Sequence, residues 1–426
     1  MSYPDTYYRR TMSETAARPA LIGPVECDTV IIGGGLAGLT AALQLARAKL
    51  SVVVLEAESV GFGASGRNGG FVSAGFATDS SAIARVTGTE TAKAIHRLSI
   101  EGVDFVRDTI SDLNIADAKP TPGIISALRY DGGDSLKRYA EDMNRDFGSD
   151  LEYMDRDQTR AILKSNRYFQ ALHSKTSFHI HPLNYLRAIA REIERLGGRI
   201  YESSAATGCQ LAGAQKIVQT AGGQVKARRV VLTTGGYTGP LVGKLKRSFL
   251  PIATYVMISE ENPDLIASAI TTRCAIGDNR RAGDYYRIVD DGKRLLWGGR
   301  ITTRAASPVA LARELRREMT GTYPQLSELK TELAWSGLMS YARHLMPQIG
   351  EMMPGVWHCT AFGGHGLNTT AIGGKIVAEG ILGQSDRYRL FQPFGLVWAG
   401  GIAGLAAAQL TYWKLQAQDW WRERAA

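Results

Sequence analysis

A glycine-rich turn between two short apolar runs constrains this chain more than any other feature of its sequence. Residues 30–32 are β-branched, as expected of a buried parallel strand, and residues 33–38 follow with glycine at the first, third and sixth positions. Residues 40–49 have the composition of a helix, and residues 51–55 form a second apolar run that ends at Glu56. This order predicts a strand–turn–helix–strand unit of an α/β fold.

The spacing of the glycines and the acid predicts a dinucleotide site. Gly33 permits the tight turn, Gly35 lets the backbone approach a pyrophosphate, and Gly38 allows the helix to pack closely on the strand. The amides at the start of the helix hold phosphate oxygens, and Glu56 binds ribose hydroxyls. A glycine-rich loop without a ligand is the alternative, and the strand, helix and acid at the expected spacing disfavour it.

Composition limits the class of protein. A chain of 426 residues with 44% hydrophobic and 21% charged residues is typical of a globular protein of about two or three domains. The net charge of +9 is scattered and accompanies no nucleic-acid-binding motif, so we expect solvated charge that steers an anionic ligand and no nucleic-acid partner. The four cysteines lie far apart without dithiol or metal-ligand spacing, which predicts a reducing, cytoplasmic location and no bound metal.

Neither end of the chain is typical of a membrane anchor. Residues 1–26 are polar and contain no signal-peptide core, and we expect residues 1–27 to be an extended leader on the surface. Residues 394–410 are the most apolar stretch, but their glycines, Gln409 and short length argue against a membrane span. We expect a packed terminal segment within a C-terminal helical region, residues 391–426, and no membrane association.

A second glycine-rich stretch follows Glu56. Five of the ten residues 61–70 are glycine, which excludes a stable helix or strand there. Its backbone amides can face a bulky planar or phosphorylated ligand, and Arg67 can neutralise the charge of that ligand. The position directly after the ribose-binding acid favours this role over a flexible loop.

The rest of the chain alternates between predicted helices and strands. Helices are predicted over residues 80–118, 136–147, 183–196, 308–323 and 371–381. Strands are predicted over residues 123–130, 199–202, 230–236, 255–259, 285–289, 294–299 and 356–360, and hairpin-like strands around residues 216–225 with Gly222 and Gly223 at the turn. The change of pattern over residues 250–334 indicates a second, sheet-rich domain inserted between pieces of the first.

Seven motifs in this order resemble the family of FAD enzymes that contains D-amino-acid oxidase, sarcosine oxidase and glycine oxidase (the DAO family). They are residues 33–38 with Glu56, residues 63–70, His181 with Pro182, and residues 230–236, 294–299, 335–337 and 363–366. Each motif alone is common, whereas the set, over residues 28–385, is specific. Within the family the chain is most similar to the γ-glutamylputrescine oxidoreductase branch, which oxidises amines.

The resemblance implies a mixed α/β fold: a Rossmann-like FAD-binding domain of discontinuous segments, with an inserted antiparallel-sheet substrate domain over the flavin. The FAD-binding domain would comprise residues 28–85, 150–245 and 335–390, and the substrate domain residues 86–149 and 246–334. FAD would be held non-covalently, because residues 337–343 lack the cysteine that attaches it in some members.

The resemblance also implies which residues hold FAD. Gly33, Gly35 and Gly38 would take the pyrophosphate, and Glu56 the adenosine ribose. Further cofactor contacts would come from Leu36, Ala37, Ala57, Gly63, Ala64, Ser65, Arg67, Asn68, Gly69, Gly70, Ala206, Thr234, Gly235, Gly337, Gly364, His365, Gly366, Leu367, Asn368 and Thr369. Residues 364–369 would follow the isoalloxazine edge, and a helix that begins near Thr370 would point its positive end there.

Candidate catalytic residues are His365, Trp297 and Tyr285, with ordinary loop or core roles as the alternative. The aromatic residues that are candidates to cage an amine are Tyr255, Tyr285, Tyr286, Trp297, Trp335 and Tyr341. Arg287 and Arg300 are candidates to bind a distal carboxylate, with solvation as the alternative.

Two departures from the family bear on the substrate and the acceptor. Members that act on free amino acids place an arginine near Met339 or a lysine near Asn368, and both are absent here. Simple α-amino acids are therefore less expected, because a buried carboxylate would be poorly paired. The oxygen-activating lysine of sarcosine oxidases is replaced near Trp297. Both oxygen and an electron carrier therefore stay open as acceptors of electrons from the reduced flavin.

The implied reaction is oxidation of a C–N bond. Hydride would pass from the carbon next to a neutral amine to flavin N5, and the imine would hydrolyse to an aldehyde or keto compound. The substrate would be γ-glutamylputrescine-like or another primary or secondary amine, as in polyamine catabolism. D-amino-acid or N-methyl-amino-acid oxidation is the alternative, and a flavin-binding protein without turnover is less expected.

Two other flavoenzyme classes fit the sequence less well. A pyridine-nucleotide disulfide reductase would need a redox cysteine pair, which the chain lacks. An NAD(P)H-dependent flavin monooxygenase would share the first glycine turn but lack the loop found at residues 363–370. The oligomeric state stays open.

Overall fold

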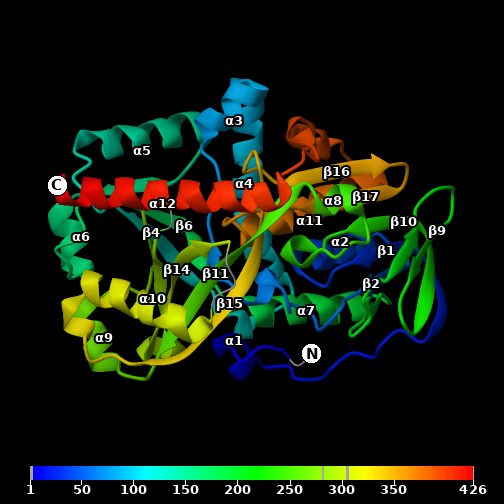
Figure 1. Ribbon diagram of the computed structural model, residues 1–426, viewed down its shortest axis with the longest axis horizontal. Coiled ribbons are helices and arrows are strands. Elements are labelled where there is room, and N and C mark those ends of the chain that lie inside the picture. The colour runs from blue at the N-terminus through cyan, green and yellow to red at the C-terminus, as the bar shows by residue number, and fades with distance from the viewer. Residues whose placement is uncertain (1–2, 281–282, 304–306, 426) are drawn as a thin grey trace.

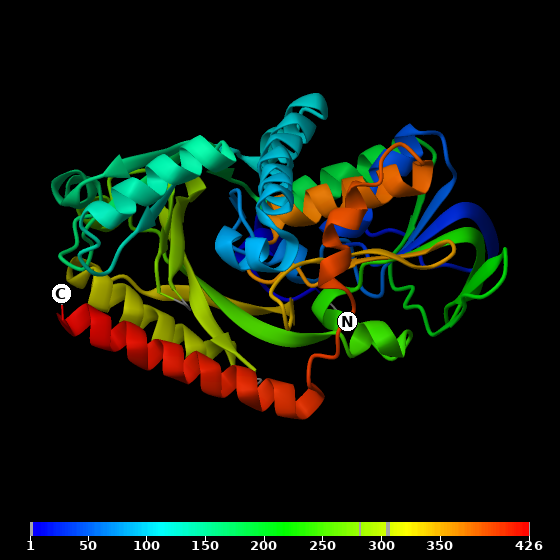
Figure 2. The same ribbon diagram turned by 90° about the horizontal axis from the view of Figure 1, so that it is seen from above.

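The computed structural model describes residues 3–280, 283–303 and 307–425. Two sheets lie side by side along the long axis of the molecule, with helices packed around them (Figure 1 and Figure 2). The mixed α/β class predicted from the sequence is confirmed.

The first sheet contains the glycine turn. Its strands are β1 (Gly23–Ile32), β2 (Val52–Leu55), β7 (Arg199–Tyr201), β8 (Gly208–Gln210), β9 (Lys216–Gln219), β10 (Gly223–Leu232), β16 (Gln348–Met353) and β17 (Val356–Thr360). They follow the order β16-β17-β10-β1-β2-β7, with β9 and β8 added beside β10. The pairs from β17 to β7 are parallel, so the residues that follow β1, β2 and β10 meet at one edge of the sheet.

The second sheet is mostly antiparallel. Its strands are β3 (Phe71–Val72), β4 (Thr121–Ala127), β5 (Leu151–Met154), β6 (Ala171–His179), β11 (Phe249–Ser259), β12 (Ala275–Asp278), β13 (Tyr285–Val289), β14 (Arg294–Thr302) and β15 (Thr331–Ala342). The order is β15-β11-β14-β13-β12-β4-β6-β3, with β5 beside β6. Sheet membership differs from the predicted domain division, because β3, β6 and most of β15 lie in segments that the sequence placed with the FAD-binding domain.

Helices surround both sheets. The α-helices are α1 (Tyr7–Arg10), α2 (Leu36–Arg47), α3 (Ser80–Thr87), α4 (Thr89–Asp112), α5 (Asp134–Phe147), α6 (Arg156–Ile162), α7 (Pro182–Arg195), α8 (Gly243–Lys246), α9 (Pro263–Ala269), α10 (Pro308–Thr322), α11 (Leu367–Leu382) and α12 (Gly401–Ala425). The 3-10 helices are η1 (Ala64–Gly66), η2 (Ala116–Ala118), η3 (Gly235–Tyr237), η4 (Asp290–Gly292), η5 (Pro324–Leu326) and η6 (Arg387–Phe394).

Two element boundaries differ from the prediction, and the structure shows why. The single helix expected over residues 80–118 is divided into α3 and α4 at Gly88, whose φ of 81° no other residue adopts easily. β1 begins at Gly23, before the expected start of the unit at Asp28, because residues 23–27 pair with the first half of β10.

A shared apolar core joins the helices of the first sheet. Side chains of α2, α4, α7 and α11 are buried in one cluster, which contains Leu39, Ile95, Ile189 and Ile372. The helices α2 and α11 cross closely, since a Cβ at Gly374 would lie 2.5 Å from the carbonyl oxygen of Ala37. This contact fixes the start of α11 relative to the glycine turn.

The N-terminal segment is only in part the extended surface leader that the sequence predicts: residues 12–20 contain no helix or strand and are exposed or half-buried, whereas the residues around α1 are anchored in the protein. Tyr8 is fully buried, and its hydroxyl donates a hydrogen bond of 2.7 Å to the carbonyl oxygen of Asn68. The Tyr3 hydroxyl donates to the carbonyl oxygens of Gly61 and Gly66 at 3.1 and 3.2 Å. The segment is therefore part of the wall around the second glycine-rich loop.

The C-terminal segment departs from its predicted packing. Phe391 and Phe394 are buried, as expected, but α12 lies on the outside of the molecule beside α10 and the second sheet (Figure 2). Its Ile402 is 88% exposed and its Trp421 is 72% exposed. Among the described residues, no helix combines the length and apolarity needed to cross a membrane.

Candidate functional site

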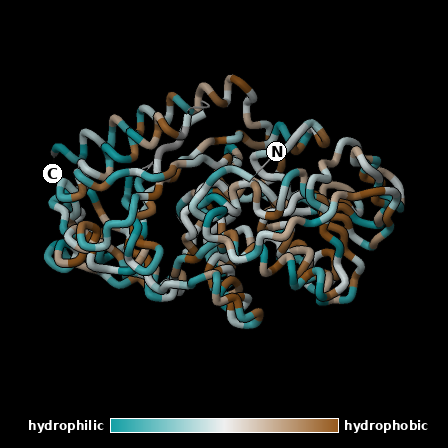
Figure 3. The backbone as a smooth tube through the Cα atoms, turned by 90° about the horizontal axis from the view of Figure 1, so that it is seen from below, coloured by the Kyte–Doolittle hydropathy of each residue, from teal (hydrophilic) through white to brown (hydrophobic). Residues whose placement is uncertain are grey.

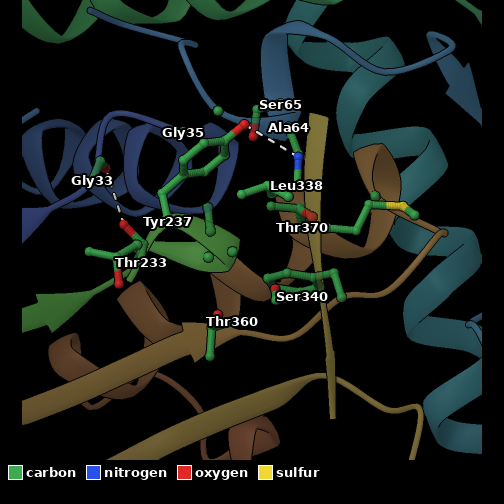
Figure 4. Close-up of a pocket in the computed structure, with 18 of the residues that line it drawn as sticks. Gly33, Gly35, Ala64, Ser65, Thr233, Tyr237, Leu338, Ser340, Thr360 and Thr370 are labelled. Carbon is green, nitrogen blue, oxygen red and sulfur yellow. Dashed lines mark hydrogen bonds between the residues drawn. The ribbon is translucent and has the colours of Figure 1, made fainter. Parts of the chain in front are cut away.

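A cavity of about 1120 Å³ lies between the two sheets, and most of the predicted cofactor residues line it (Figure 4). The predicted residues on its wall are Gly33, Gly35, Leu36, Ala37, Glu56, Ala57, Gly63, Ala64, Ser65, Arg67, Asn68, Gly69, Ala206, Thr234, Gly235, Tyr285, Gly337, Gly364, His365, Gly366, Leu367 and Asn368. Gly38, Gly70, Thr369 and Trp297 are not on the wall.

The glycine turn is shaped by close backbone contacts. A Cβ at Gly38 would lie 2.1 Å from the carbonyl oxygen of Gly33, which explains why Gly38 packs behind the wall. Gly33 has a φ of 116°, and its carbonyl accepts a hydrogen bond of 3.1 Å from the Thr233 hydroxyl (Figure 4). The backbone N–H of Leu36, the first residue of α2, donates to the Ser65 hydroxyl at 3.1 Å. The turn thus presents the start of α2 to the cavity.

Glu56 ties the glycine turn to the end of β2. Its Oε2 accepts a hydrogen bond of 2.6 Å from the Gly34 N–H, and its Oε1 accepts one of 2.9 Å from the Glu58 N–H. Burial raises the pKa of Glu56, and these two backbone donors oppose that shift. Each carboxylate oxygen has a second lone pair, so acceptor capacity remains for a ligand hydroxyl.

The second glycine-rich loop is held by its own asparagine and by a distant tryptophan. The Asn68 side chain donates to the Ser65 carbonyl at 2.8 Å and accepts from the Gly70 N–H at 2.7 Å. The Trp335 indole N–H donates to the Arg67 carbonyl at 2.9 Å. Trp335, a candidate for the amine cage, is therefore a support of this loop.

Arg67 brings a buried cation to the cavity wall. Its guanidinium donates to the carbonyl oxygens of Phe62 and Ser336 and lies 4.4 Å from the centre of the Phe62 ring and 5.5 Å from that of Tyr237. Its Nη2 is buried without a hydrogen-bond partner among the described residues. A buried donor of this kind favours an anionic or carbonyl oxygen from a ligand.

Arg287 supports the same loop from behind. Its Nε donates to the Gly69 carbonyl at 2.7 Å, and its Nη2 donates to the Tyr8 hydroxyl at 3.0 Å and to the Ile180 carbonyl at 2.8 Å. Its Nη1 lies 2.9 Å from His179 Nδ1, which accepts. The hypothesis that Arg287 binds a distal substrate carboxylate is wrong, because Arg287 is buried off the cavity wall and four of its five N–H donors are used inside the protein. Arg300, the other candidate, has its side chain outside the described residues.

The third loop, residues 361–370, ends in α11. The helix begins at Leu367, earlier than predicted, so its first amides face the cavity. Asn368 lines the cavity but donates its side-chain N–H to the Ser99 carbonyl at 3.0 Å, and the Thr369 hydroxyl donates to the His365 carbonyl. Burial lowers the pKa of His365, so the imidazole on the wall is neutral.

The aromatic candidates divide between the two faces of the second sheet. Tyr285 faces the cavity, and its ring fills the space above Gly298, where a Cβ would lie 2.1 Å from it. Trp297 is fully buried on the other face, stacked on Tyr286 with ring centres 4.1 Å apart. The geometry brings Tyr285 and Tyr341 to the cavity and leaves Trp297 in the core.

Sequence reasoning missed several wall residues. The Tyr237 hydroxyl accepts a hydrogen bond of 3.3 Å from the Leu338 N–H and so connects the two sheets (Figure 4). Thr233, directly after β10, fixes the glycine turn. The run of threonine and glycine at residues 233–236 signals a strand end at the crevice, but nothing in it points to Tyr237.

Charge on the cavity wall is sparse. Among the described residues that line it, the carboxylates belong to Glu56 and Glu58 and the one guanidinium to Arg67. The other lining residues, which include Tyr285, Leu338 and Met339, have apolar or neutral side chains. The wall that these residues form can hold an uncharged group without an unpaired ion.

Comparison with known proteins agrees with this geometry. The family described as "DAO: FAD dependent oxidoreductase" matches residues 28–380. The chain is 33% identical over 389 residues to the γ-glutamylputrescine oxidoreductase of Escherichia coli (strain K12), covering 91% of each chain. It is 29% identical over 393 residues to the probable oxidoreductase OrdL of Haemophilus influenzae, covering 91% of this chain and 90% of that one.

Solved structures show the same fold. A glycine oxidase from Geobacillus kaustophilus superimposes with a TM-score of 0.74, covering 88% of this chain and 99% of that chain at 18% sequence identity. The arrangement of the two sheets is thus shared with this structure.

Proposed function

Because the chain belongs to the DAO family of FAD-dependent oxidoreductases, we propose that it oxidises a C–N bond in an amine of the γ-glutamylputrescine type. The broader class is an oxidoreductase that acts on amines or amino acids. The similarity to the E. coli enzyme supports an amine substrate. The observation that favours an amine over an amino acid is the small number of charged groups on the cavity wall.

The cavity fits FAD. The glycine turn and Glu56 suit a pyrophosphate and a ribose, and the buried Arg67 Nη2 offers a donor that the described part of the protein leaves unpaired. Residues 33–37, 56–57 and 63–69 would hold the cofactor, with the start of α11 at its other end. Bound FAD supplies the acceptor for the hydride removed from the amine.

The side chains that would orient the substrate are uncharged and favour the neutral form of its amine. Burial raises the pKa of Tyr341 to about 12, and burial raises that of Tyr285 as well, so both are neutral phenols at pH 7. Together with Met339 they form an apolar wall that disfavours an ammonium ion and favours the neutral amine, the form whose α-hydrogen leaves as hydride. The same wall excludes water until the imine is released for hydrolysis.

A charged clamp for an α-carboxylate is missing from the described part of this wall. Arg67 is its one guanidinium and is enclosed by Phe62 and Tyr237. An α-amino acid placed beside Met339 would bury its carboxylate unpaired, at a cost of several kcal/mol. The reacting amine end of γ-glutamylputrescine pays no such penalty there, because the carboxylate of its glutamyl group lies many bonds away from the reacting carbon.

Finer proposals accompany this one. The four cysteines are free thiols, which supports a reducing, cytoplasmic location. The similarity to γ-glutamylputrescine oxidoreductase supports a role in polyamine catabolism. The two sheets support a division into FAD-binding and substrate domains. Oxygen or an electron carrier would reoxidise the flavin.

An anaerobic screen tests the substrate. The FAD-loaded enzyme is mixed with γ-glutamylputrescine, putrescine, sarcosine, glycine or D-alanine, and loss of the oxidised-flavin absorbance is followed. We expect γ-glutamylputrescine to reduce the flavin at least about a hundredfold faster than any amino acid. Reduction by amino acids alone would support the D-amino-acid or N-methyl-amino-acid alternative. Reduction by NADPH alone, or by nothing, would overturn the amine oxidoreductase.

A further inference from the structure

One exposed flank of α12 carries an apolar stripe, beside a line of mostly polar exposed residues. The members of the stripe are exposed, and each helical member lies three or four residues from another; two further members lie three and four residues before the helix. We name them the tryptophan stripe: Val397, Trp398, Ile402, Ala406, Leu410, Trp413, Ala417, Trp420 and Trp421. From Ile402 to Trp421 the stripe is about 28 Å long. Four of the seven tryptophans of the chain belong to it, and Figure 3 shows hydrophobic segments along this outer helix.

The buried side of α12, which borders the stripe, fixes the orientation of the helix. Gln409 is buried, and its Oε1 accepts a hydrogen bond of 3.1 Å from the Thr303 N–H. Glu423 forms ion pairs with Arg129 at 3.2 Å and Arg280 at 3.8 Å. These contacts hold the helix against the second sheet, so the tryptophan stripe stays outside.

The charges of α12 are sorted by face. Its basic residues Lys414, Arg422 and Arg424 are exposed, whereas its two acids, Asp419 and Glu423, are half-buried. The exposed surface of α12 therefore combines apolar, neutral polar and basic side chains, without an exposed carboxylate among its described residues. Exposed Arg247 extends the basic surface, because its carbonyl accepts a hydrogen bond of 2.9 Å from the Ala399 N–H just before the helix.

We propose that the tryptophan stripe docks the enzyme on the surface of an anionic lipid bilayer. Exposed tryptophan side chains beside lysine and arginine suit the headgroup region of a membrane, where amphipathic rings and cations are both favoured. Anionic headgroups would neutralise the exposed basic residues. A second copy is a poorer partner, because pairing two such faces brings their cations together. Surface docking needs no spanning segment, so it is compatible with the absence of one among the described helices.

Vesicle flotation of the FAD-loaded enzyme tests the proposal. Vesicles of phosphatidylcholine alone are compared with equal mixtures of phosphatidylcholine and phosphatidylglycerol, at about 50 mM and about 300 mM salt. We expect binding to the anionic vesicles that is at least about tenfold tighter than to the neutral ones and weaker at the higher salt. Lipids brominated near the headgroup should quench tryptophan emission, because the exposed tryptophans enter the interface.

Two matched variants locate the contact. The triple variant W420S/W421S/K414E should lose anionic-vesicle binding at least about tenfold while keeping FAD and activity. The control K137E/R138E/Y139S changes three exposed residues of α5, which lies on the opposite side of the molecule (Figure 2), and should bind as the parent does.

Three results would overturn the proposal. They are absence of binding to anionic vesicles at low salt, equal loss in both variants, and a dimer in analytical ultracentrifugation that the stripe variant abolishes while vesicle binding is absent. The last result would assign the stripe to a second copy. Each differs from failure of the amine screen, since docking is measured without substrate.

Discussion

Arg67 is a buried cation that finds no carboxylate among the described residues, and its aromatic surroundings keep it in place. Replacing it with methionine removes the donor proposed for FAD and also removes the cost of a buried charge. We expect R67M to weaken FAD binding at least about tenfold while changing the stability of the apoprotein by no more than about 1 kcal/mol. Fluorescence titration of the apoprotein with FAD and urea unfolding measure the two effects.

Arg287 provides the contrast to Arg67. Its guanidinium makes four structural contacts within the protein, so R287M should destabilise the apoprotein by about 3 kcal/mol or more. Equal apoprotein losses in R67M and R287M would contradict the ligand role given to Arg67.

Met339 decides the substrate class in our proposal. M339R places a guanidinium on the apolar wall, where it can pair with an α-carboxylate and repel an ammonium ion. We expect glycine or D-alanine to gain at least about tenfold relative to γ-glutamylputrescine in the rate of anaerobic flavin reduction. M352R, on β16 and off the cavity wall, serves as the control. An unchanged ratio in M339R would place the reacting amine elsewhere.

At the scale of elements, the short helix α1 supports the second glycine-rich loop through one hydroxyl. Y8F removes the donor to the Asn68 carbonyl and the acceptor for the Arg287 guanidinium, and leaves both partners buried. We expect the free energy of unfolding to fall by about 1–3 kcal/mol and FAD to bind more weakly. Urea unfolding and FAD titration measure this, with exposed Tyr139 changed to phenylalanine as the control. An unchanged FAD affinity would mean that the loop keeps its shape without α1.

The crossing of α2 and α11 has no room for a side chain. In G374V the new Cβ would meet the Ala37 carbonyl at 2.5 Å, and neither backbone can move without opening the glycine turn. We expect a loss of at least about 2 kcal/mol in stability and loss of bound FAD during purification. The flavin content of the purified protein checks this. G321V, where a Cβ meets nothing within 4 Å, is the control.

Alternation along strands limited what the sequence could predict. The glycine turn, Glu56 and the loop at residues 61–70 are local patterns, and the structure brings them to one cavity. Tyr285 and Tyr286 are neighbours with opposite faces, and register pairs them with Gly298 and Trp297. Both faces of this sheet are covered, so apolar residues occur on both, and no pattern tells which tyrosine reaches the cavity.

Long-range contacts account for most of the other differences. Tyr8 is buried because Asn68 and Arg287 lie over it, and a polar leader carries no sign of partners so far along the chain. The apolar composition of residues 394–410 suggested packing, whereas α12 turns its apolar stripe outward. Burial of either end depends on surfaces that form only when the two sheets meet.

For the whole molecule, two buried histidines make stability depend on pH. Burial and the charge of Arg287 lower the pKa of His179 and His181 to about 3, and His179 Nδ1 accepts a hydrogen bond from that guanidinium. The unfolded chain has histidine pKa values near 6.5, so below pH 6.5 it binds protons that the folded chain excludes. Stability is therefore full above this value and falls as the pH is lowered toward 3, by about 2 kcal/mol per histidine at pH 5.

Thermal unfolding of the FAD-loaded enzyme between pH 5 and pH 7 measures this dependence. The double variant H179Q/H181Q should show a shallower slope, because glutamine keeps a hydrogen-bonding side chain but does not titrate. A slope equal to that of the parent would assign the acid sensitivity to other groups.

The second glycine-rich loop has a consequence for biosynthesis. The residues that support this loop are synthesised at very different times. Tyr3 and Tyr8 leave the ribosome before the loop, whereas Arg287 and Trp335 follow it by more than two hundred residues. A nascent chain halted before Trp335 would contain a complete glycine turn but an unsupported second loop. We therefore expect FAD to bind only after residues 287 and 335 have been synthesised and packed against this loop.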